Sequence, residues 1–200
     1  MKIKEFEYLV DVLKSLPSIS TKIAERIAYF LINSDDEFYN KFIERIVDSR
    51  MKIKLCKYCK NFTSDNFICD ICSNVERRNH NLCIVSSVED LYKIENLNIF
   101  FGTYYVLHGE INYKKNETIN YINFDNIFSL IEEFGIKEIL MATNMTMNGD
   151  ITATYIKKMI CEKINGISIY RLAIGLPMNS SIEYVDWESL TFSIKNKIKM

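Results

Sequence analysis

Glycine and proline are scarce in this chain of 200 residues, which contains six of the first and two of the second. The sequence also contains no internal repeat and no low-complexity tract, so its composition does not indicate disorder. The length allows one full hydrophobic core, or a mid-sized domain with small attachments, at about 100 to 200 residues per domain.

An excess of charge of one sign is also missing, since 25 Lys and Arg stand against 26 Asp and Glu. A net charge of −1 excludes a global cationic field, so contact with nucleic acid would need a local patch or a symmetric assembly. The uncharged runs at 96–109, 139–149 and 172–182 are shorter than the roughly 20 apolar residues of a membrane span. The first residues, M-K-I-K-E-F-E-Y, carry acidic side chains where an export signal would be apolar. We therefore expect a cytoplasmic protein with no membrane contact.

Cysteine is well represented, and four of the six cysteines lie in C-K-Y-C-K-N-F-T-S-D-N-F-I-C-D-I-C. Two CxxC pairs separated by nine residues can place four thiolates around one tetrahedral ion and leave no open coordination position. The alternatives are two disulfides or a redox dithiol. A disulfide scaffold would be shorter and secreted, and a redox CxxC would occur once, near a βαβ unit. The spacing therefore predicts one structural Zn²⁺ per chain, held by Cys56, Cys59, Cys69 and Cys72.

The remaining cysteines and His80 are not predicted to bind the metal. Cys83 and Cys161 lie in apolar surroundings and are interpreted as buried small hydrophobes. His80 lies in the polar stretch S-N-V-E-R-R-N-H-N, which is typical of a linker, and the four cysteines already complete the site.

Residues 1–55 show helical periodicity, with apolar side chains recurring over 6–13, 23–31 and 38–46. Between the first two predicted helices, Pro17 discourages continuation, and Ser20 or Thr21 can cap the second helix. Lys22 and Arg26 follow at i and i+4 near its N-terminus, where free amide groups favour a phosphate. These two residues are the candidate DNA contacts. An ordinary αα corner with solvated charges is the alternative.

After residue 80 the pattern changes to strands that alternate with helices. Apolar runs predict strands at 82–85, 104–107, 139–142 and 169–173, and helical spacing predicts helices at 88–95, 124–134 and 150–163. This alternation favours a mostly parallel, covered sheet. A last helix is expected at 188–195, where Trp187 and Phe192 are either core residues or a subunit contact.

Loops at the carboxyl ends of parallel strands form the site in such a sheet. A magnesium-dependent phosphoryl-transfer site would need a glutamate in S-S-V-E-D and paired carboxylates in T-N-M-T-M-N-G-D. Ser86 and Asn148 are neutral, and of the three key positions only Asp150 carries a charge. One carboxylate does not hold a catalytic magnesium tightly, so the sequence favours binding over catalysis.

Several segments together resemble the RecR family of bacterial recombination mediators. The stretch L-P-S-I-S-T-K-I-A-E-R-I-A-Y-F-L is similar to that family's L-P-G-I-G-x-K-x-A-x-R-x-A-x-x-L helix-hairpin-helix segment. Similar matches are C-I-V-S-S-V-E-D-L-Y-K-I-E to C-V-V-E-x-P-x-D-x-x-A-I-E, Y-Y-V-L-H-G to Y-x-V-L-x-G, and A-T-N-M-T-M-N-G-D to A-T-N-P-T-V-E-G-E. R-L-A-I-G-L-P and E-Y-V-D match near the end. The resemblance covers residues 6–195, in the family's order and spacing.

The resemblance implies an α/β fold with an α-helical N-terminal part. Its expected parts are a helix-hairpin-helix region (1–55), a four-cysteine zinc finger and linker (56–79), a Toprim domain with a Rossmann-like, mostly parallel sheet (80–174), and a C-terminal oligomerisation segment (175–200). It also implies weak partner contacts at the acidic positions Asp150 and Glu95. Where the family has glycine, this chain has Ser18 and Ser20, and where it has glutamate, Ser86 and Asn148.

The function implied is that of a non-catalytic, DNA-binding mediator of recombinational repair. RecR-like proteins associate through terminal segments into rings and act with RecO and RecF to load RecA onto single-stranded DNA at gaps. A ring would let a nearly neutral chain gather its few basic residues on one surface. The alternatives are a Toprim metal-dependent nuclease or phosphotransferase, and a zinc-stabilised interaction module without DNA binding.

Overall fold

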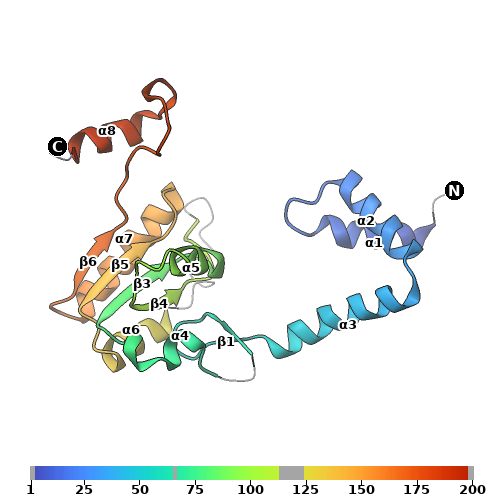
Figure 1. Ribbon diagram of the computed structural model, residues 1–200, viewed down its shortest axis with the longest axis horizontal. Coiled ribbons are helices and arrows are strands. Elements are labelled where there is room, and N and C mark those ends of the chain that lie inside the picture. The colour runs from blue at the N-terminus through green and yellow to red at the C-terminus, as the bar shows by residue number, and fades with distance from the viewer. Residues whose placement is uncertain (1–2, 65–66, 113–123, 198–200) are drawn as a thin grey trace. The chain divides into compact units, whose positions relative to one another are not determined.

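The computed structural model describes residues 3–64, 67–112 and 124–197. The chain divides into two compact units, Met1–Ile53 and Lys54–Met200 (Figure 1). The predicted fold class is confirmed: N-terminal helices precede a four-cysteine cluster, a parallel four-stranded sheet and a C-terminal helix.

The first unit consists of the helices α1 (Lys4–Lys14), α2 (Thr21–Asn33) and α3 (Asp36–Lys52). Its small core joins Val10 of α1 to Ala24 and Ala28 of α2, and the two alanines let the helices approach closely. On α3 no residue is buried, although Phe42 and Ile46 lie on it. In the part of the chain that the structure describes, Phe42 and Ile46 of this predicted amphipathic helix are therefore exposed.

The turn between α1 and α2 contains both serines that replace the glycines of the RecR pattern. Ser18 has a φ of 62°, in the left-handed region that costs an L residue roughly 1–2 kcal/mol. Ser20 has an ordinary φ of −76°, and its Oγ accepts a hydrogen bond from the backbone N–H of Ile23 at 3.4 Å. The first replacement is therefore strained, whereas the second caps α2.

Replacing Ser18 by glycine is expected to stabilise the first unit by about 0.5–1 kcal/mol, because glycine adopts positive φ without strain but loses more chain entropy. The matched change Ser20→Gly should instead destabilise it by a few tenths of a kcal/mol through loss of the cap. Urea unfolding midpoints measure both changes. A destabilised Ser18→Gly variant would contradict this interpretation of the turn.

The second unit begins with a small module around the cysteines. It contains the antiparallel strands β1 (Lys54–Leu55) and β2 (Phe62–Thr63), the short helix α4 (Asp70–Ser73) and a 3-10 turn at Val75–Arg77. A four-stranded sheet follows, with the order β4-β3-β5-β6 and every pair parallel. Its strands are β3 (Asn81–Val85), β4 (Thr103–Val106), β5 (Glu138–Ala142) and β6 (Ser168–Arg171).

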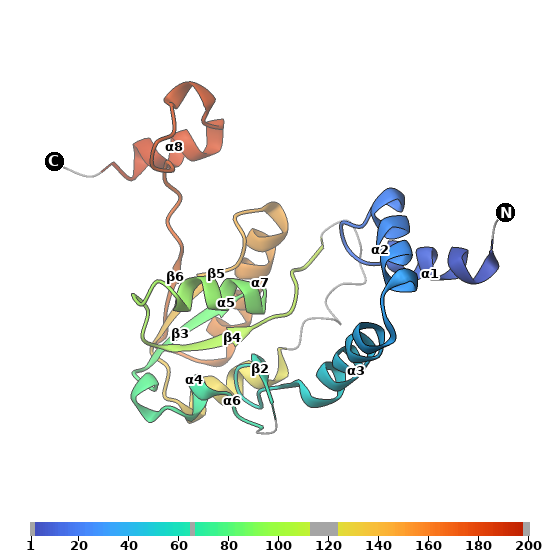
Figure 2. The same cartoon turned by 45° about the vertical axis from the view of Figure 1, so that its right-hand side comes forward.

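Helices cover both faces of this sheet. On β3, Leu82 and Ile84 face a core with α6 (Asp125–Glu133) and α7 (Met147–Lys163), while Cys83 and Val85 face α5 (Val88–Glu95). Figure 2 shows α5 and α6 on opposite sides of the sheet. The predicted strands and helices are confirmed. Alternate residues of β3 are buried on opposite faces, as expected for a parallel sheet that is covered on both sides.

The two cysteines outside the cluster differ in burial. Cys83 is buried, as predicted, and burial raises the pKa of its thiol to about 12. The prediction that Cys161 is buried is wrong, because this thiol is exposed. The helix α7 buries Ile156 and Ile160. Cys161 follows Ile160 and is rotated about 100° around the helix axis, so it lies outside the buried face.

The chain ends with a 3-10 turn at Ile182–Tyr184 and the helix α8 (Trp187–Lys195), neither of which has a buried residue. The side chain of Trp187 is 82% exposed, so it is not a core residue of this chain. Among the helices that the structure describes, none combines the length and apolar character needed to cross a bilayer.

Candidate functional site

The four predicted zinc ligands lie together. Their Sγ atoms are all within 4.8 Å of one another, all four residues are buried, and none forms a disulfide. Backbone N–H groups of Asn61 and Cys69 donate to the Sγ atoms of Cys59 and Cys56, each at 3.4 Å. Four sulfur donors at one buried point suit a tetrahedral soft ion and leave no position for a substrate. This cluster is a structural site for one Zn²⁺ per chain.

Hydrogen bonding within the cluster separates the acidities of its thiols. Hydrogen bonds from Cys59, and then from Cys69 and Cys72, lower the pKa of the Cys56 thiol. The hydrogen bond with Cys56 raises the pKa of Cys59 in turn. The negative charge of the first thiolate is thus already stabilised by its neighbours. When bound, zinc displaces the remaining thiol protons, so that all four sulfurs bind it as thiolates.

The zinc module is bonded to the edge of the sheet. The backbone N–H of Val106, on the outer strand β4, donates to the carbonyl of Cys59 at 2.8 Å. Nε2 of His108 donates to the carbonyl of Lys60 at 2.7 Å. The module therefore covers backbone groups of an edge strand that would otherwise be available for pairing with another chain.

A partly buried ion pair fixes the end of the module. The Arg77 guanidinium contacts both oxygens of Glu95, with NH1–Oε1 and NH2–Oε2 distances of 2.9 and 2.6 Å. Nε of Arg77 also donates to the carbonyl of Gly102, just before β4. Glu95, predicted as a weak partner contact, thus lies at the amino ends of the strands, where both its oxygens hold Arg77.

Asp150 lies at the other end of the sheet, in the first turn of α7. One of its oxygens accepts from Arg171 NH2 at 2.8 Å, and 64% of its side chain is exposed. The same guanidinium donates to the carbonyls of Met141, Thr143 and Asn144. The structure therefore does not bring together the two predicted acidic positions, Asp150 and Glu95.

A pocket lies at the carboxyl ends of β3, β4 and β5. Its lining includes Ser86, Asn148 and Glu110, together with the first turn of α5. Glu110 accepts a hydrogen bond from Ser86 Oγ at 2.6 Å and another from the backbone N–H of Asn144 at 2.9 Å. The residue at position 149, beside the Glu110 carboxylate, has to be glycine, because a Cβ atom there would lie 2.0 Å from the carbonyl oxygen of Asn144.

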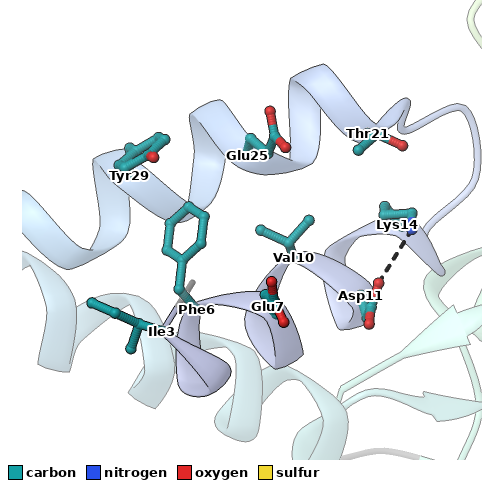
Figure 3. A pocket seen from close by; sticks show the side chains of 9 residues that line it. All are labelled: Ile3, Phe6, Glu7, Val10, Asp11, Lys14, Thr21, Glu25 and Tyr29. Atoms are coloured by element: carbon teal, nitrogen blue, oxygen red, sulfur yellow. Dashed lines mark hydrogen bonds and ion pairs between the residues drawn. The ribbon is translucent and has the colours of Figure 1, made fainter. Parts of the chain in front are cut away.

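Lys22 and Arg26 are exposed in the first two turns of α2. Within the part of the chain that the structure describes, neither forms a hydrogen bond or an ion pair. A groove beside them, between α1 and α2, is lined by apolar side chains and by the carboxylates of Glu7, Asp11 and Glu25 (Figure 3). Its lysine, Lys14, is paired with Asp11. The groove is acidic and would repel a phosphate backbone. The candidate phosphate contacts are therefore Lys22 and Arg26 and not the groove.

Comparison with known proteins identifies the family. A recombination protein RecR of Ureaplasma urealyticum serovar 10 is 46% identical over 98% of this chain and 96% of its own length. The chain belongs to the RecR family. A RecR protein of Brachyspira hyodysenteriae is 34% identical over 99% of the chain and 98% of its own length. The family model described as "Toprim domain" matches residues 80–173.

Against the RecR pattern, the neutral residues Ser86 and Asn148 stand at places where the pattern has glutamate. Sequence reasoning found these two substitutions but missed Glu110, which brings a carboxylate into the same pocket. A signal was available, because Glu110 follows the predicted strand at 104–107 and strand ends supply the site residues of such sheets. The predicted site included only the loops after the strands at 82–85 and 139–142.

Proposed function

We propose that this chain is a non-catalytic, DNA-binding mediator of recombinational repair that acts with RecO-type and RecF-type proteins to load RecA at single-stranded gaps. The observation that carries the proposal is the basic pair Lys22 and Arg26 at the start of α2, exposed and without an ion pair among the residues that the structure describes, in a chain of the RecR family. Such a pair supplies phosphate contacts that do not depend on base sequence.

The lack of catalysis is part of the proposal and is supported by the Toprim pocket. Ser86 and Asn148 are neutral, the Glu110 carboxylate already accepts two short hydrogen bonds, and Asp150 is paired with Arg171. Metal-dependent phosphoryl transfer needs hard oxygen ligands that converge on one ion. We infer that these groups shape a protein-docking surface instead.

Assembly into a ring is supported by exposed apolar residues on both terminal segments. In the first unit, α3 exposes Phe42 and Ile46 in addition to Phe38 and Val47, and in the second, Trp187 and Phe192 of α8 are exposed. Large apolar side chains that a single chain leaves in water are typical of contacts between subunits. A ring in the cytoplasm would repeat the basic pair once per subunit.

Asp150 is proposed as a partner contact, because its carboxylate is exposed and held in place by Arg171. Replacing Asp150 by asparagine should weaken the complex with a RecO-type protein about threefold to tenfold and leave DNA affinity unchanged. Titration of labelled protein with a purified RecO-type protein measures this. The matched control is Glu162→Gln, which removes another exposed carboxylate of α7. Glu95 stays a weaker candidate, because both its oxygens bind Arg77.

The same variants decide between mediator and nuclease. We expect no cleavage of gapped DNA in Mg²⁺ or Mn²⁺ by either the unaltered protein or the variants. Cleavage that disappears in the Asp150→Asn variant would replace this proposal with a Toprim nuclease.

A further inference from the structure

The zinc module carries large aromatic side chains that lie in water. The side chain of Phe67 is 80% exposed and that of Phe62 is 47% exposed. Leu55, directly opposite Phe62 in the β1–β2 pair, is exposed as well, and cross-strand neighbours share one face. Single exposed apolar residues are ordinary, but large rings gathered on one small module mark a binding surface.

The same module is basic. Between residues 54 and 67 the sequence has three lysines and one acidic residue. Lys54 and Lys57 are exposed and Lys60 is half-buried, and among the residues that the structure describes none of the three forms an ion pair. No described carboxylate neutralises these charges, so they are available to a polyanion.

Backbone and ring contacts place each phenylalanine beside a lysine. The N–H of Lys57 donates to the carbonyl of Phe67 at 2.7 Å, so these two residues are neighbours. The carbonyl of Lys60 accepts from Nε2 of His108 at 2.7 Å, and the ring centroids of His108 and Phe62 are 6.0 Å apart. The module therefore presents a ring next to a cation at two places.

The main chain that carries these side chains is fixed on both sides. Within the knuckle, the N–H of Cys56 donates to the carbonyl of Asn61 at 2.7 Å, and that of Lys60 donates to the carbonyl of Cys56 at 3.2 Å. Nδ2 of Asn126, on α6, donates to the carbonyl of Lys57 at 2.9 Å. A surface whose main chain is already ordered loses less entropy when a ligand binds.

We propose that the zinc module binds single-stranded nucleic acid through a basic aromatic patch, which consists of Lys54, Lys57, Lys60, Phe62 and Phe67. The two rings stack on unpaired bases, and the lysines contact the phosphates. Stacking on aromatic side chains, combined with cationic contacts to the backbone, holds single strands without reading their sequence. The patch does not depend on the mediator role proposed above.

The chemistry of a single strand fits the patch better than that of a protein surface. Each nucleotide supplies one negative charge and one π-face, which matches a lysine next to a ring. Phe62 also lines the pocket that contains Glu89 and Asp90. These carboxylates repel a phosphate but not an uncharged base, so at Phe62 the contact is a base. A duplex keeps its bases stacked on one another, so the patch selects single strands, whereas the basic pair at the start of α2 contacts phosphates of either kind.

Binding of a labelled oligothymidylate of about 16 nucleotides to the full-length, zinc-loaded protein tests the patch, with a blunt duplex of equal length as the second probe. Phe67→Leu and Phe62→Leu each remove one ring and keep an apolar side chain. Phe101→Leu is the matched control, because that ring is exposed elsewhere in the same unit. Zinc content and oligomer size are measured for every variant.

Phe67→Leu and Phe62→Leu should each weaken binding of the oligothymidylate about fivefold or more, because a stacked base is lost. Binding of the duplex should stay unchanged, and Phe101→Leu should alter neither probe. One zinc per chain should remain in all three variants, since the rings are exposed and are not ligands.

The lysines are tested through the salt dependence. Lys57→Gln, Lys60→Gln should flatten the slope of log affinity against log salt on the oligothymidylate by about 1.4, at about 0.7 per phosphate contact on single strands. The matched control Lys157→Gln, Lys158→Gln removes the same charge from exposed positions of α7 and should leave the slope unchanged.

Unchanged oligothymidylate affinity in both phenylalanine variants, or an equal loss for single strand and duplex, would overturn the patch. A change in oligomer size at unaltered affinity would show that the rings form a protein contact instead. If the unaltered protein retains gapped DNA but not the oligothymidylate, the patch fails and the proposed function stands, because the Lys22→Ala, Arg26→Ala variant tests that function separately.

Discussion

Replacing Cys69 by serine is expected to abolish tight zinc binding and to unfold the module at residues 54–77. A serine hydroxyl stays protonated at neutral pH and is a poor ligand for zinc, so three thiolates and an open position remain. Structural zinc contributes about 10–16 kcal/mol in zinc-finger peptides, which is comparable to the roughly 5–15 kcal/mol stability of a whole domain. Metal analysis should fall from one zinc per chain to well below one.

The loss should extend into the Toprim sheet. The carbonyl of Cys59 is the hydrogen-bond acceptor for the N–H of Val106, and that of Lys60 is the acceptor for His108. When the module unfolds, the edge of β4 loses these partners, so amide exchange at Val106 should accelerate and the chain should aggregate more readily.

The matched control for this experiment is Cys161→Ser, because Cys161 is exposed and lies outside the cluster. This control should keep one zinc per chain and the exchange rate of the unaltered protein. A Cys69→Ser variant that retains a full equivalent of zinc would contradict the assignment of the ligands.

The double change Lys22→Ala, Arg26→Ala is expected to abolish retention of gapped DNA at moderate salt. Both side chains are exposed and unpaired in the described part of the chain, so their charge is available to phosphates. Each phosphate contact adds about 0.9 to the slope of log affinity against log salt on duplex DNA, and a ring repeats the contacts in every subunit. The slope should therefore flatten as well.

A matched control is available in the same unit. Lys41 and Arg45 of α3 are also exposed and stand at i and i+4, so Lys41→Ala, Arg45→Ala removes the same charge. If the effect comes from net charge alone, both double variants should weaken binding equally. Unchanged affinity and slope in a correctly assembled Lys22→Ala, Arg26→Ala variant would show that these residues are solvated charges beside an ordinary αα corner.

The Ser18→Gly variant is expected to change DNA binding as well as stability. The glycines of the RecR pattern permit positive φ and a close approach of the backbone to phosphate. Because Ser18 has that φ already, glycine there should relieve strain and open the hairpin backbone to DNA at once. DNA affinity should then rise together with stability.

The sequence by itself determined the order of elements, the zinc ligands and the family resemblance. Helical and strand periods are local properties, so the runs at 23–31 and 82–85 predict α2 and β3 without any tertiary contact. The doubled CxxC spacing defines four thiolates within 17 residues, close enough in the chain for one ion.

Only the tertiary structure decided which side chains meet. Glu110 bonds Ser86 and Asn144, 24 and 34 residues away, because the segment after β4 crosses the ends of two other strands. Arg77 and Glu95 pair across 18 residues, which places Glu95 at the amino ends of the strands and away from Asp150, the other predicted partner contact. Such contacts depend on the order and register of the strands, and a periodic pattern is the same for every order in which those strands can pair.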